Sequence, residues 1–126
     1  MIRLAEYIAK NYNGKVVEVG IGYYFKVAEY LTKRGLKVIA TDIKPLNAPV
    51  DFYVDDIRNP RIEIYQDSTL IYSIRPPLEI VKDILRVSRI VGADCIIKPL
   101  YGDYLNVKPK NYKGLSFYIF NYNRYR

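Results

Sequence analysis

Hydrophobic and polar positions follow two different periods along the chain, and these periods predict helices and strands. Hydrophobic side chains recur at helical spacing over residues 2–12, around 27–31 and over 78–88. Asn59-Pro60 opens a short helical or irregular stretch. Short apolar or alternating runs, rich in β-branched and aromatic residues and bounded by turn residues, predict six strands. These strands cover residues 15–19, 36–41, 51–54, 68–73, 93–98 and 115–121.

The order of these elements predicts the fold class. Strands alternate with helical patterns through most of the chain, which is typical of a parallel sheet covered by helices on both faces. About 16 residues separate the fifth and sixth strands, and they show no helical pattern, so we expect the last strand to enter antiparallel. We therefore predict an α/β protein, a single-domain three-layer α/β/α sandwich over residues 1–126 with a mostly parallel sheet of about six strands.

Composition excludes several kinds of chemistry. The chain has 126 residues, which fits one domain, and it contains no histidine and a single cysteine. A histidine base, a histidine metal ligand and a thiolate cluster are therefore excluded, and we expect no metal site. Cys95 lies in an apolar run and is predicted to be a small buried hydrophobe. No signal-like leader and no apolar run approaching about 18 residues is present, so we expect a cytoplasmic protein that does not contact membranes.

The positive charge gathers toward the C-terminal end. The net charge is +7, of which residues 1–63 carry +2 and residues 64–126 carry +5. Basic and aromatic residues alternate from 108 to 126 without any acid. They are Lys108, Lys110, Tyr112, Lys113, Phe117, Tyr118, Phe120, Tyr122, Arg124, Tyr125 and Arg126. One interpretation is a surface for a stacked anionic partner such as RNA, and the other is a solvated basic face whose aromatics enter a core strand.

The segment from Glu18 to Gly22 has the character of a ligand-binding turn. In a parallel sheet, ligands bind beyond the carboxyl ends of the strands, and this turn follows the first strand. A carboxylate at the end of an apolar strand needs a cation or several donors, and a ligand ammonium group would serve Glu18. Gly20 and Gly22 allow a tight turn close to a ligand. A dinucleotide site would have a third glycine at position 25, where this chain has Phe25.

Acidic residues follow the second and third strands. Asp42 comes 20 residues after Gly22, a spacing at which an acid accepts hydrogen bonds from ribose hydroxyls. Asp56 can accept from the exocyclic amine of adenine while Ile57 packs against the base, or Asp55 takes that role. The alternatives are a glycine turn needed only for packing, Asp42 as a loop residue or cap, and an ordinary turn at residues 55–56.

These residues carry a resemblance to a known class of enzymes. Glu18-x-Gly20-x-Gly22, Asp42 and Asp56 resemble the first three cofactor motifs of class I S-adenosylmethionine-dependent methyltransferases. With the run from Ile71 to Pro77, the chain is similar to a family of small, functionally uncharacterised archaeal proteins related to those enzymes. The likeness covers roughly residues 15–100 and implies a truncated, Rossmann-like methyltransferase fold. It implies that Glu18, Gly20 and Gly22 hold the methionine portion of S-adenosylmethionine, Asp42 the ribose, and Asp56 with Ile57 the adenine.

Two positions depart from the methyltransferase pattern. Tyr24 stands where the third glycine of the motif is usual. After the fourth strand, amino-methylating enzymes commonly have Asn or Asp, then two prolines and an aromatic residue. This chain keeps Pro76 and Pro77 but lacks both the amide or acid before them and the aromatic after them. Methyl transfer depends mostly on positioning the acceptor in line with the donor carbon. Ser73 and Arg75 are candidates for the acceptor side; the alternative, which the sequence slightly favours, is that Ser73 ends a strand and Arg75 is a surface charge before a helix. Where a base is needed, it would be Tyr72, Tyr101, Tyr104 or an aspartate.

We therefore expect an S-adenosylmethionine-binding, methyltransferase-like protein whose acceptor is open, RNA being one candidate. The alternative is a non-catalytic module that binds RNA or a protein partner through the basic, Tyr-rich C-terminal segment. A different nucleotide enzyme on the same fold ranks last, because no phosphate-binding Lys-Ser/Thr pair follows the glycines. The short chain has no added domain for a large acceptor, which favours a homodimer or a partner subunit.

Overall fold

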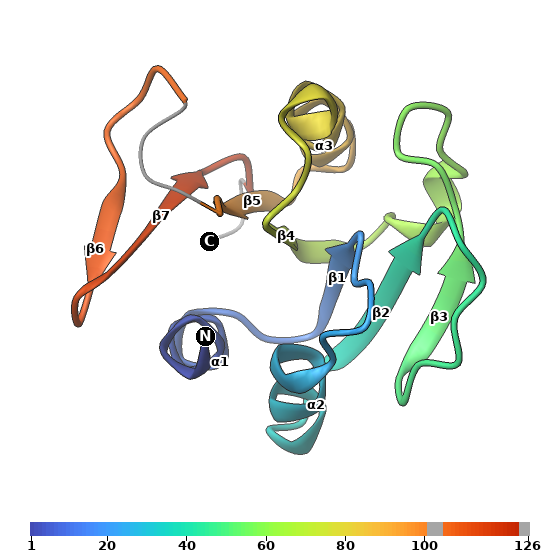
Figure 1. The fold of residues 1–126 in the computed structure, drawn as a ribbon, viewed down its shortest axis with the longest axis horizontal. Helices are drawn as coiled ribbons and strands as arrows, with labels where there is room; N and C mark the ends of the chain where they lie inside the picture. Colours follow the sequence, from blue (N-terminus) through green and yellow to red (C-terminus); the bar gives the residue numbers. More distant parts are fainter. Residues whose placement is uncertain (101–104, 124–126) are drawn as a thin grey trace.

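A computed structural model describes residues 1–100 and 105–123. It confirms the predicted three-layer α/β/α fold, with α1 and α2 on one face of the sheet and α3 on the other (Figure 1). The elements in chain order are α1 (Ile2–Asn11), β1 (Lys15–Val19), α2 (Lys26–Lys33), β2 (Lys37–Asp42), β3 (Asp51–Val54), the 3₁₀ helix η1 (Ile62–Ile64), β4 (Ser68–Ile74), α3 (Leu78–Val91), β5 (Asp94–Lys98), β6 (Lys110–Tyr112) and β7 (Leu115–Phe120).

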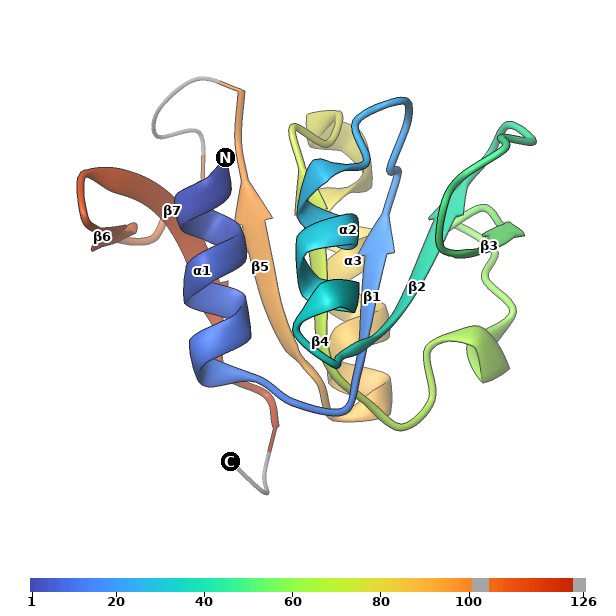
Figure 2. The same cartoon turned by 90° about the horizontal axis from the view of Figure 1, so that it is seen from below.

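The sheet has the strand order β3-β2-β1-β4-β5-β7-β6. The first five strands in this order are parallel, and β7 is antiparallel to β5, as predicted for the last long strand. From β1 the chain winds first toward β3 and then toward β5, so the winding direction reverses between β1 and β4. Ligands bind beside such a switch point, beyond the carboxyl ends of the strands. Figure 2 shows the ends of β1 and β5 at the same end of the sheet as the turn from β1 into α2.

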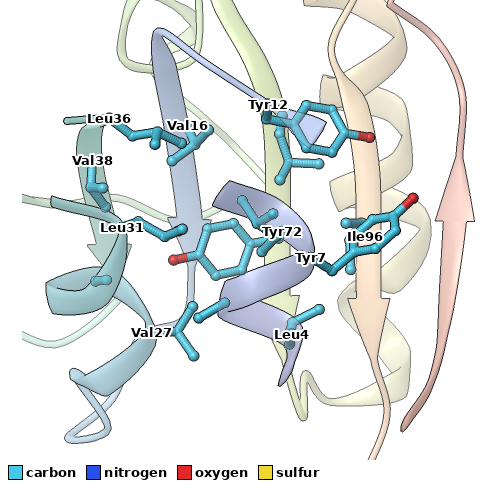
Figure 3. Close-up of a cluster of buried hydrophobic side chains, with 14 of the residues drawn as sticks. Leu4, Tyr7, Tyr12, Val16, Val27, Leu31, Leu36, Val38, Tyr72 and Ile96 are labelled. Atoms are coloured by element: carbon cyan, nitrogen blue, oxygen red, sulfur yellow. The ribbon is translucent and has the colours of Figure 1, made fainter. Parts of the chain in front are cut away.

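Two layers of hydrophobic side chains hold the sheet between the helices. Val16 of β1 packs with Ile8 of α1 and Leu31 of α2, whereas Val17, the next residue, belongs to the layer under α3. Figure 3 shows the first layer, where Tyr72 of β4 lies among side chains of both helices. The central strands are buried on both faces, as a parallel sheet covered by helices requires. This explains why their sequences are continuous apolar runs.

The sheet has one strand more than the six or so that the sequence predicts, because β6 lies in the stretch of about 16 residues between the fifth and sixth predicted strands. Its three residues pair antiparallel with β7, and the two-residue connection is Lys113-Gly114. Both connecting residues have positive φ, 50° and 85°, as the twisted turn of a tight hairpin requires. A short, exposed edge strand has no hydrophobic alternation to reveal it. Tyr101, Tyr104, Arg124, Tyr125 and Arg126, which the sequence singled out, lie outside the described residues.

Within residues 1–100 and 105–123, no helix has the length and apolar character needed to cross a membrane.

The burial of α1 leads to a stability prediction with an internal control. Ile8 is fully buried under the sheet, and Ile2 on the same helix is 55% exposed. We expect Ile8→Ala to lower the free energy of unfolding by about 2–5 kcal/mol, because it removes buried contacts and leaves a cavity. Ile2→Ala should cost less than about 1 kcal/mol. Chemical denaturation of both variants is the measurement, and equal losses would contradict the packing of α1 described above.

Candidate functional site

A cleft of about 310 Å³ opens at the carboxyl ends of β1, β2 and β3, next to the start of α3. It brings together four of the predicted cofactor residues, Gly20, Asp42, Asp56 and Ile57, and leaves Glu18 and Gly22 outside its lining. The residues that line it are Val19, Gly20, Thr41, Asp42, Ile43, Asp55, Asp56, Ile57, Arg58, Pro77, Glu79 and Ile80.

Hydrogen bonds to β2 hold the glycine turn. The N–H groups of Gly20 and Ile21 both donate to the Thr41 carbonyl, at 2.8 and 3.1 Å. The Gly22 N–H donates to Oδ2 of Asp42 at 2.8 Å, and Oδ1 of Asp42 accepts from the Lys44 N–H at 3.2 Å. Gly22 has a φ of 58°, which a residue with a side chain rarely adopts. Each carboxylate oxygen accepts about two hydrogen bonds, so Asp42 keeps one acceptor position on each oxygen.

The two adjacent acids after β3 have different partners. Asp55 is buried, and its carboxylate accepts from the Tyr65 hydroxyl at 2.7 Å and from the Arg61 N–H at 3.1 Å, which fixes the loop after β3. Asp56 is more exposed, and the Arg58 side chain donates to both of its oxygens, at 3.1 and 3.0 Å. These hydrogen bonds lower the pKa of the Asp56 carboxyl, so it remains ionised.

Ile57 gives the cleft an apolar floor beside Asp56. Its side chain is buried and packs in the layer under α3. A flat apolar base can pack against such a side chain, while the carboxylates lie at the polar edge of the cleft.

Glu18 points into the core beneath the turn. Its side chain is 1% exposed, and Oε1 accepts from the Tyr72 hydroxyl at 2.8 Å. Burial raises the pKa of the Glu18 carboxyl from its ordinary value of 4.5 to about 8, so the acid is mostly protonated at neutral pH. The sequence predicts that the Glu18 carboxylate needs a cation or several donors. Its partner in the structure is instead the hydroxyl of a tyrosine in the core. The expectation that Tyr72 could act as a base is wrong, because its hydroxyl is fully buried and burial raises its pKa well above the ordinary value.

The two acceptor-side candidates have separate environments at the end of β4. Ser73 is 1% exposed, and its hydroxyl donates to the Val19 carbonyl at 2.7 Å, which joins β4 to β1. Arg75 is exposed, with a φ of 54°, and its backbone N–H donates to the Lys98 carbonyl at 2.6 Å. The guanidinium carbon lies 5.9 Å from the centre of the Tyr24 ring. Arg75 therefore faces the turn that carries Tyr24.

The cleft is acidic in a protein of net charge +7. Its lining contains Asp42, Asp55, Asp56 and Glu79, against Arg58 as the basic lining residue. Among residues 1–100 and 105–123, no group of three or more metal-ligating side chains is close enough to hold a metal ion. Burial raises the pKa of the Cys95 thiol to about 12, so it remains protonated and unreactive. The chemistry of the cleft is that of carboxylates and apolar side chains.

Residues 1–122 match the uncharacterised protein family UPF0146. This chain belongs to that family. It is 54% identical to the UPF0146 protein of Archaeoglobus fulgidus, with 99% of this chain and 98% of that protein covered. It is 40% identical to the UPF0146 protein of Pyrococcus abyssi, with 94% and 97% covered. The likeness to an archaeal family that the sequence predicted is therefore confirmed.

Solved structures with the same fold include methyltransferases. A TehB-like SAM-dependent methyltransferase from Corynebacterium glutamicum has a TM-score of 0.63 at 20% identity, with 93% of this chain and 84% of that chain covered. TehB from Haemophilus influenzae has a TM-score of 0.57 at 17% identity, with 77% and 40% covered.

A chain assigned as a Zn-dependent alcohol dehydrogenase from Rhodobacter sphaeroides also has the fold. Its TM-score is 0.60 at 15% identity, with 82% of this chain and 48% of that chain covered. The UPF0146 chain thus spans less than half the length of this structure and of TehB. The likeness establishes a methyltransferase-like fold, and the choice of ligand depends on the residues of the cleft.

Burial of Glu18 predicts a pH-dependent stability. Between pH 4.5 and about 8 the folded protein retains the Glu18 proton and the unfolded chain releases it, so this group makes stability fall as pH rises. Glu18→Gln, which resembles the neutral acid, removes that slope. We expect the stability of the variant relative to wild type to rise between pH 5 and pH 8 by about 3 to 4 kcal/mol, because the two pKa values differ by more than this pH interval. Urea denaturation at both pH values measures it, and a difference independent of pH would show that Glu18 does not titrate in this way.

Proposed function

We propose that this UPF0146 protein binds S-adenosylmethionine in the cleft at the ends of β1, β2 and β3 and acts as a small methyltransferase. The observation that carries this proposal is the acidic character of the cleft beside a glycine turn that has few free donors. S-adenosylmethionine carries a sulfonium cation and an ammonium group and has no phosphate. Carboxylates attract such a ligand, and the fold places them where nucleoside cofactors bind.

The same geometry argues against a dinucleotide. A pyrophosphate binds to free N–H groups at the turn between the first strand and the helix that follows it, here the turn from β1 into α2. Here the N–H groups of Gly20 and Ile21 are taken by Thr41, and that of Gly22 is taken by Asp42. Asp55 and Asp56 are paired with Arg61 and Arg58, but the carboxylates of Asp42 and Glu79, which form no ion pair among the described residues, would also repel a phosphate. The hydrogen-bonding pattern thus supports a cationic nucleoside ligand.

The residues of the cleft fit this ligand in a defined orientation. Asp42 accepts from the ribose hydroxyls with its remaining acceptor positions, and Ile57 packs against the adenine. Asp56 accepts from the exocyclic amine while it keeps Arg58 as its partner. In this proposal Glu18 acts from behind the turn, because its bond to Tyr72 fixes the end of β1. When bound, the cofactor would supply an electrophilic methyl group to a lone pair of the acceptor, and the electron pair of the carbon–sulfur bond would remain on sulfur.

A second candidate function, RNA binding by the β6–β7 hairpin, follows from a different observation. Phe117 and Tyr118 are buried, so these two aromatics belong to the core, as expected if the aromatic residues of this segment enter a core strand. The Lys110 ammonium lies 5.7 Å from the centre of the Tyr7 ring, and that of Lys113 lies 5.4 Å from the Tyr112 ring. The lysines themselves are exposed. This hairpin supports contacts to phosphates more than stacking of bases.

Calorimetric titration tests the cofactor proposal. We expect S-adenosylmethionine to bind with a dissociation constant in the micromolar range, on the order of −8 kcal/mol, and NADH to give no heat. Asp42→Ala should weaken binding at least about tenfold, because it removes the ribose acceptor and releases the turn. Asp51→Ala is the matched control, since it removes the same charge at the opposite end of β3. No heat from folded wild type, or equal losses in both variants, would refute the proposal.

Salt-dependent binding of a single-stranded RNA tests the second candidate. Replacing Lys108, Lys110 and Lys113 with alanine should weaken binding and reduce its salt dependence, because three phosphate contacts are lost. Replacing Lys33, Lys37 and Lys82 with alanine makes the same change in net charge on other exposed surfaces and should have a smaller effect. Fluorescence anisotropy at several salt concentrations is the measurement. Equal effects of the two triple variants would mean that the hairpin is not an RNA site.

A further inference from the structure

The charges at the ends of the parallel strands change sign across the switch point. Asp42 ends β2, and Asp55 directly follows β3, on one side of β1. Arg75 directly follows β4, and Lys98 ends β5, on the other side. The register pairs Ile74 with Lys98, so Arg75 comes immediately beyond that pair. The order of the strands therefore divides this end of the sheet into an acidic half and a basic half.

Arg75 is held in a conformation that its type disfavours. Its φ of 54° lies in the left-handed region, and it precedes Pro76, which favours extended backbone in the residue before it. The hydrogen bond from its N–H to the Lys98 carbonyl, at 2.6 Å, fixes the backbone there. Strained residues of this kind gather at functional sites, where the surrounding structure holds them in place.

The strained backbone places the guanidinium across the switch point. Its carbon lies 5.9 Å from the ring centre of Tyr24, so a side chain of β4 meets the turn that follows β1. Tyr24 replaces the glycine that is usual in the methyltransferase motif, and here its ring supports the cation. The guanidinium thereby lies next to the turn from β1 into α2, and neither Arg75 nor Tyr24 is among the residues that line the cleft.

Arg75 and Lys98 form no ion pair with an acid in the part of the chain that the structure describes. The ion pairs described for residues 1–100 and 105–123 are Arg58–Asp56, Arg61–Asp55 and Arg86–Asp83, and they do not include Arg75 or Lys98. The Arg75 side chain is exposed and that of Lys98 is half-buried. Arg75 and Lys98 are joined through their backbones and form no ion pair among the described residues; a planar fork of donors and an ammonium at one end of the sheet have the chemistry of a phosphate or carboxylate site.

We propose that Arg75 and Lys98 form an anion-binding site that holds a phosphate or carboxylate group of the methyl acceptor. The description of the anion as part of an acceptor rests on the proposed cofactor function. The anion site itself depends only on Arg75, Lys98 and Tyr24. In this arrangement the acidic half of the sheet end binds the cationic cofactor, the basic half binds the anionic acceptor, and the glycine turn lies between them.

An NMR titration of ¹⁵N-labelled full-length protein with inorganic phosphate, and separately with acetate, tests the site and distinguishes the two anions. We expect saturable shifts of the Arg75 and Lys98 amides with the preferred anion. Arg75→Gly should weaken its binding about tenfold, ~1.4 kcal/mol, and should fold, because glycine accepts a φ of 54°. Arg75→Lys keeps the charge and should retain part of the affinity. Lys33→Gln removes the same charge at the end of α2 that is farther from the glycine turn, and this variant should bind the anion like wild type.

The outcomes separate this site from the cofactor proposal. Loss of anion binding in Arg75→Gly with unchanged S-adenosylmethionine binding supports both. Loss of anion binding without cofactor binding to any variant keeps the anion site and refutes its role beside a methyl donor. Equal weakening in Arg75→Gly and Lys33→Gln, or the absence of saturable shifts with either anion, would overturn the site, because net charge alone would then explain the response.

Discussion

The hydrogen bond between the Gly22 N–H and the Asp42 carboxylate is the contact on which the site depends. The parallel register pairs Val19 with Thr41, so the residue that ends β2 comes to lie beside the turn that follows β1. Thr41 then accepts two N–H groups of the turn and Asp42 accepts the third. The turn is thus held in the conformation that opens the cleft, and the same bonds occupy the donors that a phosphate would need. Pairing of β1 with β2 determines both the shape of the cleft and its preference for charge.

The strands beside the switch point are joined on both faces. On the side of α1 and α2, Tyr72 donates to Glu18, and Ser73, whose side chain alternates to the other face, donates to the Val19 carbonyl. A buried carboxyl is costly when charged, and retention of its proton keeps this cost low at neutral pH. These bonds fix the end of β1 directly below the glycine turn. An acid whose position in the sequence is typical of a ligand contact therefore contributes to the site by fixing the strand from which the glycine turn begins.

Local patterns were sufficient to predict most of the fold and part of the site. The buried strands and the amphipathic helices have periods that any window of the sequence shows, and the carboxyl ends of parallel strands meet by topology, which brought Gly20, Asp42 and Asp56 to one cleft. The direction of Glu18 and the different partners of Asp55 and Asp56 depend on Tyr72, Tyr65, Arg61 and Arg58, and nothing local in the sequence identifies those pairs. Strand β6 was missed because its pairing depends on the twisted turn at Lys113-Gly114 rather than on hydrophobic alternation.

The separation of acidic and basic residues at the sheet end affects ligand binding in a way that the net charge of +7 does not. Strands lie about 4.8 Å apart, so Asp42 at the end of β2 and Arg75 beyond β4, two strands away, are separated by roughly 10 Å along the sheet. Salt at physiological concentration screens exposed charges over about 8 Å. Each half therefore acts mainly on the ligand group next to it, while the overall positive charge adds only weak, salt-sensitive attraction of anions. A cationic donor and an anionic acceptor would each be attracted to its own half and would meet above the glycine turn, where the orientation of the two reactants determines the rate of transfer.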